Sequence, residues 1–175
     1  MARNPRALSP SEAREQAADY FGFAASEWLK VGDEKFEIPN PGLMDDEQLE
    51  RYEELQDSLR FCDRDEVERR NAITGEVVVH PVTGDPVVDH VLIEPHRKGG
   101  ELVRPPYAVR LAIALWGQDG YDLYVAKCKE IGEKPNTTLI PVIWRKMQRQ
   151  FSDRLAQDSK SAGSTDADEV VADGD

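Results

Sequence analysis

The sequence is poor in cysteine and has no long apolar run. Its 175 residues include two cysteines, Cys62 and Cys128, and this spacing fits neither a zinc motif nor a disulfide framework. We expect both to be small buried hydrophobic residues in a reducing cytoplasm. No apolar stretch approaches the roughly 20 residues of a membrane span, and no signal peptide is expected. These absences exclude the membrane, disulfide-rich secreted and zinc-finger classes.

Basic residues are also scarce. Lys and Arg number 22 against 34 Asp and Glu, which gives a net charge of −12. Because nucleic-acid affinity depends on Lys and Arg that displace counterions from phosphate, we expect no nucleic-acid partner. The one basic segment, from Arg145 to Arg154, predicts a helix face that is solvated or docks on the chain's own acidic segment.

The N-terminal part predicts a helix, a hairpin and a second helix. Ser9 to Glu12 has the pattern of a capping box, with Pro10 at the first helical position, so the first helix should run to about Tyr20. Alternating residues on both sides of Gly32-Asp33 predict a β-hairpin with one buried face. The second helix, from residue 45 or 46 to about 62, has an acidic outer face and an apolar stripe of Leu49, Tyr52, Leu55, Leu59 and Cys62.

Residues 71–104 predict an excursion of short strands and loops. Thr74-Gly75-Glu76-Val77-Val78 recurs as Thr83-Gly84-Asp85-Pro86-Val87-Val88 after nine residues. Thr-Gly before an acidic residue favours turns, and valine pairs favour strands, which we expect at 76–80 and 87–93. Two repeats are too few for a solenoid.

The C-terminal part predicts three helices. They should cover about 107–116, 119–131 and 138–157, with Gly117 ending the first. We expect the helices at 107–116 and 138–157 to pack as the main core, with Trp116, Trp144 and Met147 largely buried. Trp28 also lies in an apolar pattern that indicates core.

The fold class is therefore expected to be mainly α with a small β component. Residues 1–8 should be a flexible N-terminus and 9–158 a single mainly helical domain with the inserted excursion at 71–104. Residues 159–175 should be a disordered acidic tail, because their composition cannot bury enough apolar surface to order itself.

Catalytic and metal motifs are weak throughout the chain. His90, Glu94 and His96, with His80 nearby, could be imagined as a metal site, but their spacing matches no helical ligand pair, and loop histidines without a role are the favoured interpretation. No local motif activates either cysteine as a nucleophile. We therefore expect no enzyme activity, no cofactor, no metal site and no catalytic residue.

Several segments together resemble a known family. They are the hairpin EWLKVGDEKFEIP, the acidic helix after it, Leu111 to Gly117 (LAIALWG), Tyr121, and Ile143 to Gln150 (IWRKMQRQ). In combination they look like the tail assembly chaperones of long-tailed bacteriophages, most of all those of phages that infect actinobacteria. The resemblance covers roughly 23–62 and 105–157 and omits the Thr-Gly excursion.

The resemblance implies a non-enzymatic protein that binds the tape-measure protein before tail polymerisation and is not retained in the mature virion. Tail-tube subunits and a longer, frameshifted form of the chain are further candidate partners. On this view the partner-binding residues are Glu47, Glu50 and Glu54 on the acidic helix, which steer the partner, and Phe151 and Leu155 on the last helix. The alternatives are a virion structural protein, such as a head–tail connector or minor tail subunit, and a small regulatory protein.

Overall fold

The structure, a computed structural model, describes residues 7–161, which form two compact units. The first unit contains 7–46 and 122–161, and the second contains 47–121. Within this described part, four α-helices and three short antiparallel strand pairs confirm the mainly α class with a small β component. The expectation of one domain over 9–158 stays a prediction. The predicted disordered tail covers 159–175, but the last helix runs to Ser161, so the expectation is wrong for 159–161, and the rest of the tail lies outside the described residues.

The first unit begins with the helix α1 (Pro10–Phe21), whose start follows from its capping box. The Glu12 amide donates to Ser9 Oγ at 3.3 Å, and the Ser9 amide donates to Glu12 Oε2 at 2.9 Å. The hydrogen bond from the Ser9 amide, together with one from Ser9 Oγ to the same carboxyl oxygen at 3.0 Å, lowers the pKa of the Glu12 carboxyl. Gly22 ends the helix in the left-handed conformation, with φ of 69°, which a glycine adopts without steric cost. The predicted helix is thus confirmed to within a residue at its end.

The predicted hairpin is also confirmed. Strands β1 (Ser26–Val31) and β2 (Glu34–Pro39) pair antiparallel around the two residues Gly32 and Asp33. One face is buried through Val31, Phe36 and Ile38. Trp28 lies on the opposite face and is 54% exposed, so the expectation that it belongs to the core is wrong. Its register partner Glu37 shares that face, where alternation places the polar side chains.

The remaining helices of this unit are α4 (Leu139–Ser161) and the part of α3 (Tyr107–Glu130) that follows residue 121. Ile140, Trp144 and Met147 are buried along one stripe of α4, as predicted. A short 3-10 turn η1 (Pro41–Leu43) packs against α4. Tyr124 of α3 places its ring edge-on to Phe36, with 5.3 Å between the ring centroids.

Gly117 interrupts α3, as predicted. Its φ of 72° and ψ of 172° are not helical, so the two predicted helices at 107–116 and 119–131 are joined by a kink. The part before the kink belongs to the second unit, where Leu111 and Leu115 are buried. Trp116 is only partly buried.

The second unit also contains the helix α2 (Asp46–Leu59), whose buried stripe differs from the prediction at its N-terminal end. Leu55, Leu59 and Cys62 are buried as expected, but Leu49 is 41% exposed. Gln48 is buried instead, and its Nε2 donates to the Leu115 carbonyl at 3.2 Å. Periodicity alone could not show this, because a buried hydrogen-bond acceptor on a neighbouring helix made the polar residue the better fit.

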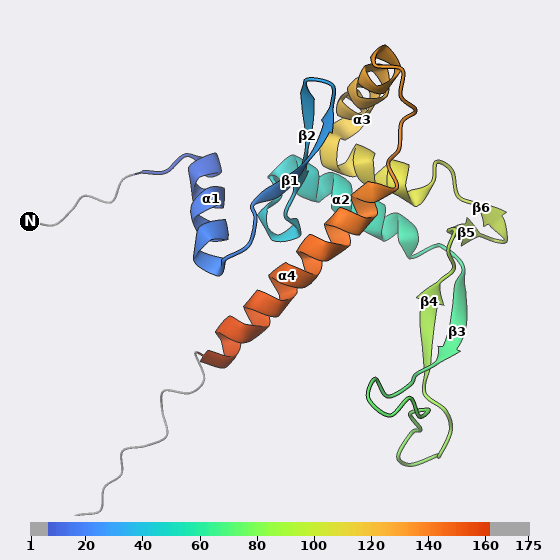
Figure 1. The fold of residues 1–175 in the computed structure, drawn as a ribbon. Helices are drawn as coiled ribbons and strands as arrows, with labels where there is room; N and C mark the ends of the chain where they lie inside the picture. The colour runs from blue at the N-terminus through green and yellow to red at the C-terminus, as the bar shows by residue number, and fades with distance from the viewer. Residues whose placement is uncertain (1–6, 162–175) are drawn as a thin grey trace, which may run out of the picture. The chain divides into compact units, whose positions relative to one another are not determined.

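A two-stranded arm follows α2 (Figure 1). Strand β3 (Arg64–Glu68), which the sequence pattern did not predict, pairs antiparallel with β4 (Val88–Leu92). The strand predicted at 76–80 is reduced to isolated bridges at Val77 and Val79. Beyond the arm, β5 (Arg97–Lys98) and β6 (Glu101–Leu102) form a short hairpin. Asp63 holds this hairpin, since its carboxylate accepts the Gly99 and Gly100 amides at 2.8 and 2.7 Å.

Candidate functional site

The predicted steering residues lie on the outer face of α2. Glu47, Glu50 and Glu54 are all exposed. The opposite side of the helix is fixed within the second unit, because Arg51 Nε donates to the Ala114 carbonyl at 2.9 Å and Gln48 reaches the next carbonyl. Arg51 also approaches Glu47 at 3.5 Å. The anchored helix thus presents an open row of carboxylates, which is suited to long-range attraction of a basic partner.

Phe151 and Leu155 lie in the C-terminal half of α4 and differ in their surroundings. Phe151 is half-buried, and its ring meets that of Phe23 at a centroid separation of 5.6 Å. It also covers Gly42, where a Cβ atom would come within 2.1 Å of the ring. Leu155 is 42% exposed. Phe151 therefore has a packing role within the first unit, whereas Leu155 remains available to a partner.

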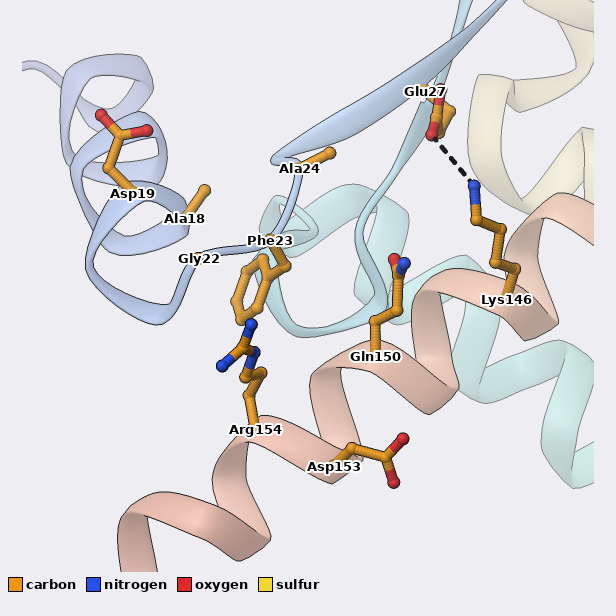
Figure 2. Close-up of a pocket in the computed structure, with 10 residues that line it drawn as sticks. All are labelled: Ala18, Asp19, Gly22, Phe23, Ala24, Glu27, Lys146, Gln150, Asp153 and Arg154. Atoms are coloured by element: carbon orange, nitrogen blue, oxygen red, sulfur yellow. Dashed lines mark ion pairs between the residues drawn. The ribbon is translucent and has the colours of Figure 1, made fainter.

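A groove of about 660 Å³ lies in the first unit between the end of α1, the segment after it and α4 (Figure 2). Phe23, Ala18 and Ala24 supply apolar surface. Lys146 pairs with Glu27 across the groove at 3.9 Å, and Arg154 points from α4 toward Phe23. The lining residues include no histidine, cysteine or hydroxyl group. Its mixture of apolar, cationic and anionic side chains suits the groove to an amphipathic side chain or peptide.

The Thr-Gly repeat of the sequence is a structural repeat. In each copy a side chain accepts the amides two and three residues further on: Asn71 Oδ1 at 2.8 and 3.1 Å, and His80 Nδ1 at 3.3 and 3.4 Å. Each turn continues with a glycine at positive φ, Gly75 or Gly84. The nine-residue period in the sequence therefore encodes two turns of the same kind.

Three backbone hydrogen bonds close these turns into a ring. The Val78 amide donates to the Arg69 carbonyl, the Val87 amide donates to the Val78 carbonyl, and the Arg69 amide donates to the Val87 carbonyl, each at 2.8 Å. The three residues are spaced nine apart, like the two copies of the repeat. Arg69, the first of them, lies before the first Thr-Gly copy. We call residues 69–88 the double-turn head.

The head carries one exposed aliphatic residue at the tip of each turn, and the sequence analysis did not predict this feature. Ile73 is 95% exposed and Val82 is 85% exposed, at equivalent positions of the two turns. Turn tips favour Gly, Asn, Asp, Ser and Pro, so an aliphatic residue immediately before Thr-Gly in both copies was the available signal. The repeat presents the same apolar feature twice.

His96 lies in a hydrogen-bonded cluster of the second unit. It is buried, and its ring is edge-on to Tyr107 at 5.2 Å. Arg110 Nη2 lies 3.1 Å from His96 Nδ1, and since arginine can only donate, Nδ1 must accept and the neutral ring carries its proton on Nε2. Burial lowers the pKa of His96 below 6.5, and Arg110 lowers it further, whereas Glu94 raises it. The second terminal nitrogen of the Arg110 guanidinium, Nη1, donates to Ser58 Oγ at 3.2 Å.

The imagined metal site does not assemble. His90 is exposed with its Nδ1 4.0 Å from Glu66, whereas His96 faces Arg110. Over residues 7–161, no group of three His, Cys, Asp or Glu side chains is arranged to hold a metal ion. Cys62 and Cys128 are both buried and unpaired as thiols, as the sequence predicted.

Comparison with family models, curated proteins and solved structures finds no match to this chain. In the described part of the chain, no helix combines the length and the apolarity that crossing a membrane requires.

Proposed function

We propose that this chain is a tail assembly chaperone of a long-tailed phage, a non-enzymatic protein that binds a helical segment of the tape-measure protein. Tail-tube subunits are a second candidate partner. The protein acts in the host cytoplasm and leaves before the virion is complete. The proposal begins from the resemblance of the hairpin, the acidic helix and the C-terminal helices to that family.

The observation that carries the proposal is the open groove beside the C-terminal half of α4. It combines the apolar surface of Phe23 with cations and carboxylates on its walls, and Leu155 of the same half-helix is exposed. An amphipathic helix binds by placing apolar side chains in such a groove while its charged flanks meet charges at the rim. A chaperone for a long helical protein needs a surface of this kind.

The acidic face of α2 supports the same function in a different way. Its glutamates are solvated, so each ion pair with a partner contributes little affinity. Their collective field attracts Lys and Arg and raises the rate of encounter. A net charge of −12 also keeps a protein with exposed apolar surface in solution.

The test is co-expression of the full chain with the tape-measure protein of the same phage. The tape-measure protein should remain soluble only with this chain, and the two should elute as one complex. A Phe23→Ser, Leu155→Ser variant should lose the complex, whereas the matched Val67→Ser variant, which changes an exposed residue of the arm, should keep it. Equal solubility of the tape-measure protein with and without this chain would refute the proposal.

The virion structural protein is the second candidate. The observation that favours it is the two-stranded arm with its exposed valines, because fixed contacts between subunits require such protruding apolar surface. Purified particles distinguish the two functions. A structural subunit is present in a fixed ratio to the other tail proteins, whereas the chaperone is absent.

A further inference from the structure

The double-turn head exposes apolar side chains that its own fold does not need. Ile73 and Val82 are 95% and 85% exposed, and the turns are held by backbone and polar side-chain hydrogen bonds rather than by these residues. Each tip is followed three residues later by an acidic residue, Glu76 or Asp85. The two cations of the head, Arg69 and Arg70, pair instead with Asp89 and Glu68, which flank it. The head is therefore a doubled apolar and anionic feature.

A complementary surface lies on the outer face of α4, in its N-terminal half. Leu139 is 51% exposed and Val142 is 61% exposed. Arg145 and Arg149 follow Val142 at helical spacings of three and seven, so they share its face. Both arginines are exposed, and neither forms an ion pair with a side chain of residues 7–156. This face pairs two aliphatic side chains with two uncompensated cations.

We propose that the double-turn head of one chain docks on the outer face of α4 in a second copy of the chain. Ile73 and Val82 cover Leu139 and Val142, while the carboxylates of the head meet Arg145 and Arg149. The two surfaces are complementary in apolarity and in charge, because aliphatic tips meet aliphatic residues and anions meet cations. The surface lies in the N-terminal half of α4, away from Leu155, so the inference does not depend on the proposed chaperone function.

The geometry of this contact determines the form of the assembly. The head and the α4 face are different surfaces, so the contact is heterologous and each docked copy leaves one head and one α4 face available. The assembly can close reciprocally as a pair, in which each head docks on the α4 face of the other copy, or extend into larger rings or open chains. Because the tips are small, the buried area is small and the association is weak and concentration-dependent.

Sedimentation velocity of the full chain over a wide range of concentrations tests the proposal. The wild type should shift to larger species as its concentration rises. The Ile73→Ser, Val82→Ser variant should lower the association constant about tenfold or more, as loss of central apolar contacts does. The matched Ile73→Leu, Val82→Leu variant keeps apolar tips and should associate like the wild type, and circular dichroism should show that all these variants are folded.

Complementary variants make the test specific to these two surfaces. An Arg145→Glu, Arg149→Glu variant should also stay monomeric, because its α4 face repels the head. Mixed with the Ile73→Ser, Val82→Ser variant, it should form a 1:1 complex that grows no further, since one intact head then meets one intact α4 face. A wild type that stays monomeric at all concentrations, or a mixture that forms no complex, would overturn the proposal. The tips would then be a contact surface for a different protein.

Discussion

At the scale of single residues, the structure separates groups that the sequence pattern treats alike. Phe151 and Leu155 belong to one apolar stripe, yet only Phe151 is fixed against Phe23 and η1. Gly42 makes this packing possible, because its missing side chain leaves room for the ring. A residue proposed for partner binding can therefore also support the fold, and its substitution must be interpreted with that in mind.

Gly42→Ala tests this close approach. The added Cβ would lie 2.1 Å from Phe151 Cε2, so the substitution should lower the free energy of unfolding by about 1–3 kcal/mol, as overpacking does. In a Phe151→Ala background the same substitution should cost much less, because the ring that it meets is gone. Urea unfolding of the four proteins gives the coupling. Equal costs in the two backgrounds would show that the ring does not occupy this position.

His96 should make the stability depend on pH. Its folded-state pKa is lowered, so a fall in pH through 6.5 adds a proton to the unfolded chain before the folded one. The stabilising contribution is present above pH 6.5 and is lost progressively below it. In His96→Asn, the side-chain oxygen can accept from Arg110 but does not titrate, so this variant should lose less free energy of unfolding over that interval. An unchanged pH dependence in the variant would contradict this assignment.

At the scale of elements, the helices are decided by local signals and their buried faces by their neighbours. The capping box of α1 and the kink at Gly117 form where the sequence places them. The buried stripe of α2 differs from the one that the sequence predicts, because Gln48 replaces Leu49 on the buried side. Strand β3 had no period-two signal, since all five of its residues are exposed and only pairing with β4 defines it.

Two tryptophans provide a comparison at this scale. Trp144 on α4 is 2% exposed and Trp28 on β1 is 54% exposed. Trp144→Ala should reduce the free energy of unfolding by about 3–5 kcal/mol, because it leaves a large cavity. Trp28→Ala removes the same atoms from a largely solvated site and should cost less than half as much. Thermal and urea unfolding measure both, and equal losses would mean that α4 does not carry the core of its unit.

At the scale of the whole molecule, the effect of the acidic charge depends on where the acidic residues lie as well as on the net charge. Reversal of Glu47, Glu50 and Glu54 to Lys should slow association with the tape-measure protein and flatten its salt dependence, because steering acts on the encounter rate. Reversal of the exposed Glu15, Glu101 and Glu133 changes the net charge equally and serves as the control. Stopped-flow association rates at several salt concentrations compare the variants. The same slowing in both would assign the effect to net charge alone.

The sequence by itself determined those features whose causes are local. Capping boxes, proline and glycine positions and helical periodicity act within a few residues, so they specified the mainly α class, the β1–β2 hairpin, the break in α3 and the buried stripe of α4. It also showed the nine-residue repeat. Only the tertiary structure decided which surfaces are open. The ring of Arg69, Val78 and Val87, the burial of Gln48 and the packing of Phe151 on Gly42 depend on partners that are distant in sequence, and no local pattern contains the position of a distant partner.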